Sequence, residues 1–141
     1  MTTAEITFVD TNILVYAHDR SETRRQPLAE ALLEELWARR TGRLSSQVLQ
    51  EFYSVATRRL DPPMCRAEAR DIVNQYAAWP VVLADPTLIL TASALEEDHG
   101  LSFWDALIVE AARRAGATRL VTEDLQDGRV FAGVRVENPF R

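Results

Sequence analysis

Four acidic side chains lie next to apolar segments and are candidates for chemistry. They are Asp10, Glu51, Asp105 and Asp124. Asp10 directly follows a short apolar run and Asp124 comes shortly after another, whereas the other two lie in segments with helical periodicity. Carboxylates that converge from separate segments can hold a divalent cation through oxygen, which is the ligand type that Mg²⁺ prefers. This chemistry requires that the fold brings the four segments to one place.

The two acids that follow apolar runs are expected at one edge of a sheet. Asp10 follows Ile6–Val9, and Asp124 closes the run that begins at Leu120. In an open parallel sheet, ligands collect at the carboxyl ends of the strands. Each acid also has an ordinary explanation, because an aspartate after a strand is often a helix cap or a turn residue. Asp124 has a turn pair, Asp127-Gly128, close by.

The two acids in helical segments carry signals of different strength. Ser102 and Asp105 have the spacing of a capping box, in which Asp105 returns a bond to the Ser102 amide. On a helical wheel Asp105 lies about 140° from Glu110 and shares the apolar stripe, where a carboxylate needs a partner. Glu110 falls on the polar side with Arg113 and Arg114. Both interpretations of Asp105 remain open, and Glu51 only borders an apolar face.

Short apolar strands alternate with amphipathic helices along the chain. The strands are expected at Ile6–Val9, Leu44–Ser46, Val81–Leu83, Leu120–Thr122 and Val134–Val136, and the helices at 21–41, Gln47–Leu60, Arg66–Ala78, 85–99 and 102–115. This alternation predicts an α/β fold of three layers, α/β/α, with a mostly parallel central sheet. The length of 141 residues fits a single domain over residues 1–141.

Composition excludes several classes of function. No apolar run approaches the roughly 20 residues of a membrane span, and no secretory signal is visible, so we expect a cytoplasmic protein without a membrane partner. Cys65 is alone, so no internal disulfide forms. His18 and His99 form no ligand-spaced pair, which disfavours a zinc site and histidine catalysis.

All 16 basic residues are arginine. A chain without lysine does not fit a phospho-accepting receiver domain. An Asp-x-Asp phosphatase is disfavoured for the same reason, and also because position 12 is Asn. Paired arginines such as Arg24-Arg25 and Arg39-Arg40 fit solvated helix faces or contacts to phosphates. The net charge of −5 does not by itself indicate a nucleic-acid partner.

Together these motifs resemble the PIN-domain ribonucleases, and within them the VapC-type toxins of toxin–antitoxin pairs. The resemblance covers essentially the whole chain. The matching segments are Val9–Asn12, Ser46 with Glu51, Ser102–Ala106 and Leu120–Leu125. It implies a PIN fold, a Mg²⁺ or Mn²⁺ cofactor, and hydrolysis of RNA to 5′-phosphate and 3′-hydroxyl products.

The resemblance also implies roles for individual residues. Asp10, Glu51, Asp105 and Asp124 would form the acidic site, with Asp10 and Asp105 nearest the metal and the other two often acting through water. Asn12, Ser46 and Thr122 would orient carboxylates or waters, and Asp127 would be an outer fifth acid.

The partners implied by the resemblance are a second copy of the chain and a small antitoxin whose C-terminal segment crosses the acidic site. An antitoxin groove formed by Leu32, Leu33, Leu36, Trp37, Phe52 and Tyr53 is one interpretation of these residues, and plain core packing is the other. An alternative function is a PIN fold that binds RNA or a protein without cutting.

Overall fold

The computed structural model describes residues 5–141 and contains one six-stranded sheet with six helices. The strands are β1 Thr7–Val9, β2 Gly42–Ser45, β3 Val81–Val82, β4 Arg119–Val121, β5 Val130–Phe131 and β6 Val134–Glu137. The helices are α1 Thr11–Ala17, α2 Arg25–Arg39, α3 Ser46–Arg58, α4 Arg66–Tyr76, α5 Pro86–His99 and α6 Phe103–Arg114. The strand order is β3-β2-β1-β4-β6-β5.

The sheet is parallel except at one edge, where β5 pairs with β6 in the antiparallel direction. In the middle of the sheet, Phe8 of β1 pairs in register with Arg43 of β2 on one side and Leu120 of β4 on the other. Strands β1 and β4 are almost fully buried, as expected for parallel strands covered on both faces. The carboxyl ends of β1 and β4 therefore meet at one edge of the sheet.

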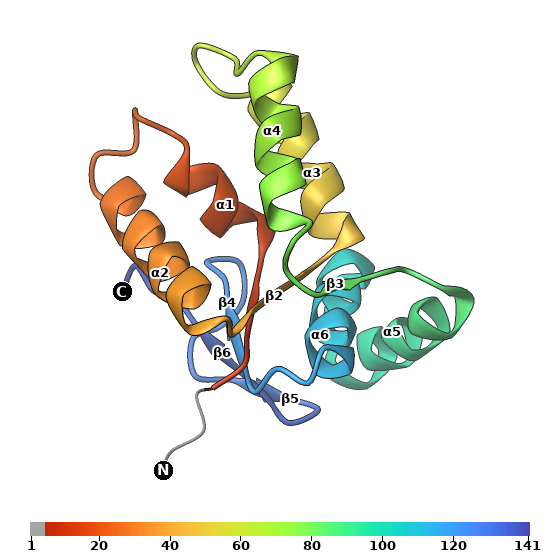
Figure 1. The fold of residues 1–141 in the computed structure, drawn as a ribbon. Helices are drawn as coiled ribbons and strands as arrows, with labels where there is room; N and C mark the ends of the chain where they lie inside the picture. The colour runs from red at the N-terminus through yellow and green to blue at the C-terminus, as the bar shows by residue number, and fades with distance from the viewer. Residues whose placement is uncertain (1–4) are drawn as a thin grey trace.

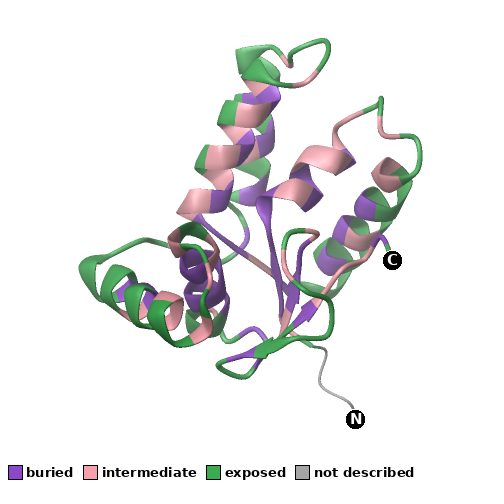
Figure 2. Cartoon of the chain, turned by 180° about the vertical axis from the view of Figure 1, so that it is seen from behind, coloured by how far each residue is buried: buried purple, intermediate pink, exposed green. Residues whose placement is uncertain are grey.

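Helices cover both faces of the sheet, which confirms the predicted three-layer α/β/α fold. Figure 1 shows α1 and α2 on one side, α5 and α6 on the other, and the α3–α4 pair rising above the carboxyl ends of β1 and β2. Burial is concentrated on the strands and on the inward helix faces (Figure 2). Among residues 5–141, no helix combines the length and apolarity needed to cross a bilayer.

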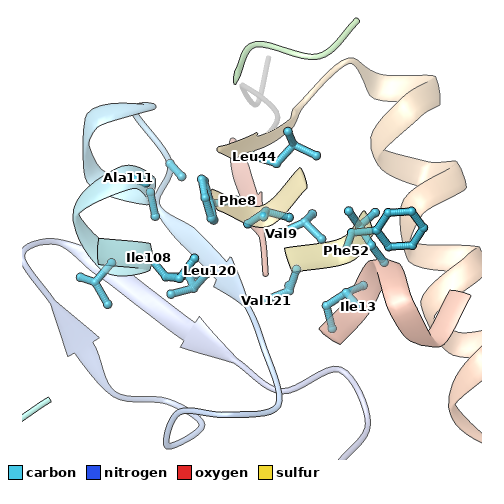
Figure 3. Close-up of a cluster of buried hydrophobic side chains, with 14 of the residues drawn as sticks. Phe8, Val9, Ile13, Leu44, Phe52, Ile108, Ala111, Leu120 and Val121 are labelled. Atoms are coloured by element: carbon cyan, nitrogen blue, oxygen red, sulfur yellow. The ribbon is translucent and has the colours of Figure 1, made fainter. Parts of the chain in front are cut away.

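The core follows from the alternation of side chains along β1. Phe8 points toward α6 near Ala111, whereas Val9 points toward Phe52 of α3 (Figure 3). Leu33, Leu36 and Phe52 are at most 3% exposed and belong to this core, so core packing is the correct interpretation for them. They are not available to line an antitoxin groove.

The structure adds two elements to those predicted from the sequence. Helix α1 has seven residues; Asp10 caps it, and its own side chains Ile13 and Leu14 are buried. Strand β5 has two residues, too few to give a pattern. Helix α2 begins at Arg25 rather than Ser21, and Ser45 caps α3 by accepting a hydrogen bond from the Val48 amide.

Candidate active site

Asp10 lies at the carboxyl end of β1 and is 5% exposed. One carboxylate oxygen accepts from the Thr11 amide at 2.7 Å, which caps α1, and the other accepts from the Thr122 hydroxyl at 2.8 Å. The capping explanation therefore holds, but both donors to this buried carboxylate within residues 5–141 are neutral. Burial raises the pKa of Asp10 to about 7, and the charges of Asp124 and Glu51 act in the same direction.

Asn12 and Thr122 bring Asp124 to the same edge of the sheet. The Asn12 amide nitrogen donates to the Asp124 carboxylate at 3.1 Å and to the Thr122 hydroxyl at 3.3 Å. The Thr122 hydroxyl also accepts from the Asp124 amide at 3.1 Å. These bonds join the start of α1 to the loop after β4, so the structure places Asp10 and Asp124 together as the strand order predicts.

Glu51 reaches this edge from α3. Its carboxylate accepts from the Thr11 hydroxyl at 2.9 Å and from the Gln47 side chain at 3.0 Å. Glu51 is half-buried and is connected to the residue next to Asp10, so it is more than an ordinary surface residue.

Asp105 is in the first turn of α6, where the Ser102 hydroxyl accepts from its amide at 3.1 Å. Only this half of the predicted capping box forms within residues 5–141; no hydrogen bond returns from the Asp105 carboxylate. Its charge acts on Asp124, whose pKa is raised first by burial and then by Asp105, Glu123 and Glu51. The four predicted acids therefore form one electrostatically coupled group.

The prediction that Glu110 lies on the solvent-exposed polar side of α6 is wrong. This side chain is 0% exposed, and both of its oxygens accept hydrogen bonds from Arg113 at 2.5–3.1 Å. The wheel misplaced it because α5 packs against the outer side of α6 and covers a face that periodicity assigns to solvent.

Two of the predicted supporting residues make no hydrogen bond to the four acids within residues 5–141. Asp127 accepts from the Asn138 amide at 2.7 Å and lies near Arg141, so the C-terminal segment engages it rather than the four acids. Ser46 is the first residue of α3, directly after the cap Ser45, and its role beside the acids stays a prediction. The histidines lie elsewhere: His18 packs against Phe52 and His99 against Phe131.

The donor set fits a hard divalent cation. All four acids offer oxygen, and among the described residues no cationic side chain forms a hydrogen bond with buried Asp10. Within residues 5–141, no three acidic, histidine or cysteine side chains come close enough to hold one ion directly. This spacing suits Mg²⁺, which usually takes one or two carboxylates and keeps several waters.

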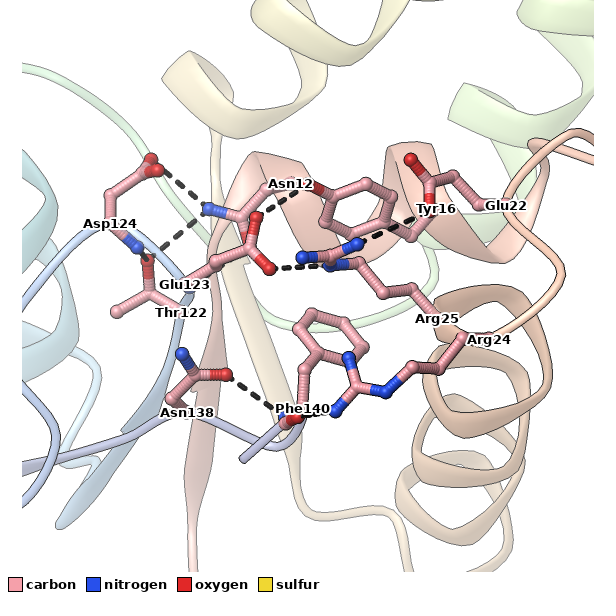
Figure 4. Close-up of polar contacts among 10 residues, drawn as sticks. All are labelled: Asn12, Tyr16, Glu22, Arg24, Arg25, Thr122, Glu123, Asp124, Asn138 and Phe140. Carbon is pink, nitrogen blue, oxygen red and sulfur yellow. Dashed lines mark hydrogen bonds and ion pairs between the residues drawn. The ribbon is translucent and has the colours of Figure 1, made fainter.

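A second polar network lies directly beside Asp124 and was not predicted. Glu123 accepts from the Tyr16 hydroxyl at 2.5 Å and from the Arg25 side chain at 2.6 Å (Figure 4). Burial would raise the pKa of Glu123, but the bonds from Tyr16 and Arg25 outweigh it and lower the pKa. Arg25 is therefore paired with Glu123 and Glu22 while its side chain stays 34% exposed. We call Tyr16, Arg25 and Glu123 the Glu123 clamp.

Comparison with known proteins gives consistent results. The sequence profile of the PIN domain matches residues 7–130. Ribonuclease VapC7 of Mycobacterium tuberculosis (strain ATCC 25618 / H37Rv) is 31% identical over 119 residues, which cover 82% of this chain and 80% of VapC7.

Three solved structures share the fold. The chain matches a structure of FitAB bound to an IR36 DNA fragment with a TM-score of 0.72 and 18% identity, covering 96% of each chain. VapBC2 from Rickettsia felis, bound to a promoter DNA fragment, gives a TM-score of 0.62 at 21% identity, with 94% of this chain and 97% of that one covered. VapC20 of Mycobacterium tuberculosis, described as a toxin that cleaves the sarcin–ricin loop, gives 0.56 at 20% identity, with 81% and 86% covered.

Proposed function

Because this chain belongs to the PIN domain family, and within it to the VapC-type ribonucleases, we propose that it is a metal-dependent endoribonuclease and the toxin of a toxin–antitoxin pair. The observation that carries the proposal is the coupled group of Asp10, Glu51, Asp105 and Asp124 at the carboxyl edge of the sheet. Two of these acids meet through Asn12 and Thr122, residues that lie 110 positions apart.

We assign the four acids different tasks. Asp10 and Asp105 would hold a Mg²⁺ or Mn²⁺ ion directly, since one is buried at the end of β1 and the other has no hydrogen-bonded partner in the described residues. Glu51 and Asp124 would accept hydrogen bonds from the ion's waters. The chemistry supplied by the bound ion is activation of a water and stabilisation of charge on the scissile phosphate.

The neighbouring side chains keep these acids in place. Thr11 and Gln47 each donate to one oxygen of Glu51, which fixes that carboxylate. Asn12 donates to one oxygen of Asp124, so within residues 5–141 the second oxygen of Asp124 is left for a water. Thr122 donates to Asp10 and accepts from the Asp124 amide, which couples the positions of the two acids. Such outer partners typically change metal affinity or activity by about 10–100-fold when removed.

We propose RNA, an antitoxin and a second copy of the chain as the partners. A negatively charged edge is electrostatically complementary to a basic antitoxin tail. Large apolar side chains are exposed on α5, just before it and at the start of α6, as expected of an interface between copies. They are Leu83, Ile89, Leu90 and Trp104.

The decisive experiment is RNA cleavage by the purified chain with and without Mg²⁺. Asp105→Asn keeps the size of the side chain and the Ser102 cap, so it should fold normally and lose more activity than the about 100-fold typical of outer-shell changes. Asp98→Asn, an exposed change on α5, is the matched control and should cleave normally.

The products should carry 5′-phosphate and 3′-hydroxyl ends. Equal activity of Asp105→Asn and the parent chain would refute the assignment of the site. A parent chain that binds RNA but leaves it intact at every Mg²⁺ concentration would instead indicate a binding module.

A further inference from the structure

A second pocket lies at the opposite end of β2 from the acidic site. It has a volume of about 620 Å³ and is formed by the end of α2, the start of β2 and the segment after α4. Trp37, Arg40, Gly42, Arg43 and Trp79 line most of it, and none of its lining residues is acidic. We call it the Trp37 pocket; the proposed nuclease mechanism makes no use of it.

The aromatic wall of the Trp37 pocket is built into the fold. Trp79 is 6% exposed and lies directly on Gly42, where a Cβ atom would be 2.5 Å from the indole. The Trp37 ring lies 5.2 Å from the Trp79 ring and 5.4 Å from the Tyr76 ring, measured between centroids. Trp37 nevertheless remains 39% exposed. A fixed aromatic cluster therefore presents one accessible indole at the pocket.

Two arginines place uncompensated positive charge beside this indole. Arg43 donates to the Arg40 carbonyl at 3.3 Å and to the Gly42 carbonyl at 2.9 Å, which holds its side chain at the pocket. Neither Arg40 nor Arg43 lies within ion-pair distance of a carboxylate in residues 5–141. In a chain with a net charge of −5, this is a local reversal of sign.

Arg40 also has a backbone conformation that favours glycine. It ends α2 with a φ of 58°, in the left-handed region where helices commonly end on glycine. A side chain in this position adds strain that glycine would not have. Arginine at this position therefore lowers the stability of the fold relative to glycine. The substitution Arg40→Gly removes the guanidinium without destabilising the fold, so a loss of binding can be told apart from a loss of folding.

An exposed indole between two arginines has the chemistry that single-stranded nucleic acid requires. Bases of any sequence stack on aromatic side chains, and guanidinium groups bind phosphates. We propose that the Trp37 pocket binds a nucleotide of single-stranded RNA, with the base stacked on Trp37 and the flanking phosphates held by Arg40 and Arg43. The choice of RNA rests on the proposed ribonuclease function.

The Trp37 pocket lies at one end of β2, and the edge of the sheet that carries the acidic site lies at the other. Gly42 at the pocket and Ser45 at the start of α3 are the two ends of β2, about 10 Å apart at the usual rise of a strand. An acidic peptide would also be attracted to the arginines, but it offers no planar base to stack on Trp37. A basic antitoxin tail would be repelled.

The test is fluorescence anisotropy of a short, labelled, unstructured RNA in EDTA, where no metal-dependent cleavage occurs. Arg40→Gly should weaken binding about fivefold to tenfold while leaving the melting temperature unchanged or higher. It should also reduce the slope of log Kd against log salt by about 0.7, as expected for one lost phosphate contact on a single strand. Trp37→Ala should weaken binding about tenfold or more, and Trp37→Phe should restore part of the loss.

Arg39→Ala is the matched control, because it removes the same charge at the neighbouring position. Arg39 is already paired with Glu35 at 3.3 Å. It should leave both Kd and the salt slope unchanged. The proposal is overturned if the parent chain does not bind the RNA, or if Arg40→Gly and Trp37→Ala bind like the parent. Equal weakening by Arg39→Ala overturns it as well, since binding would then be diffuse.

Polyglutamate is added at a concentration of negative charge equal to that of the RNA phosphates. If it displaces the RNA, the pocket binds acidic peptides and the proposal is overturned. Failure of the chain to cleave RNA in Mg²⁺ with RNA binding intact would refute the proposed function alone. The two results are therefore distinguishable.

Discussion

The stability of the chain without divalent metal should fall as pH rises from about 5 to about 8, because of Asp10. Its pKa is about 7 in the folded state and 3.8 ordinarily, chiefly because of burial. Between these values the folded state holds a proton that the unfolded state has released. The free energy of unfolding therefore loses nothing through Asp10 below about pH 4. It decreases between about pH 4 and about pH 7, and the loss is complete above that.

The size of this effect follows from the shift. About three pKa units at about 1.4 kcal/mol each give on the order of 4 kcal/mol, of which about 3 kcal/mol falls above pH 5. For a chain of this length, about 3 °C per kcal/mol converts this into a drop in melting temperature on the order of 10 °C. Asp124, whose pKa is also raised, adds to the loss in the same direction.

Added Mg²⁺ should reverse the loss at about pH 8 and have little effect at about pH 5, where it must displace the proton on Asp10. Differential scanning calorimetry in EDTA and in Mg²⁺ measures both effects. Asp10→Asn should flatten the pH dependence and remove most of the metal response, whereas Asp98→Asn should behave like the parent chain. A parent melting temperature that is constant or rises with pH in EDTA would refute this reasoning, as would parallel curves for the parent and Asp10→Asn.

Three further substitutions test other contacts. Glu123→Gln weakens the Glu123 clamp beside Asp124 and should lower Mn²⁺ affinity about tenfold by titration calorimetry; unchanged affinity would mean that the clamp does not position the site. Arg113→Ala leaves buried Glu110 without its partner and should lower the free energy of unfolding, measured in urea, by roughly 3 kcal/mol. A decrease below about 1 kcal/mol would contradict the buried pairing. Gly42→Ala forces a methyl group into Trp79 and should cost about 1–3 kcal/mol and shift tryptophan emission, so a spectrum and stability equal to the parent's would count against the close packing.

Much of the fold and the positions of Asp10 and Asp124 could be predicted from local patterns, whereas Glu51 and Asp105 were assigned to the acidic site through the resemblance to PIN-domain ribonucleases. Buried apolar runs mark β1 and β4, and the acid after each run must lie at the carboxyl edge of the sheet. Helix α1 was missed because seven residues give little periodic signal, and its stability comes from the Asp10 cap and from packing.

Other features could not be predicted, because they depend on contacts between distant segments. Tyr16 and Glu123 of the clamp are 107 positions apart, and neither shows a local pattern that indicates the other. Glu110 is buried by a neighbouring helix, which no wheel drawn on one helix can represent.

The position of β4 between β1 and β6 affects how the protein matures during synthesis. Until β4 leaves the ribosome, β1 has an unpaired side, and Asp10 lacks the Thr122 hydroxyl that donates to it. A nascent chain that stops short of this strand carries three of the four acids but cannot assemble them with the fourth. If the proposed function holds, we expect the emerging polypeptide to be unable to cleave RNA until β4 has been made.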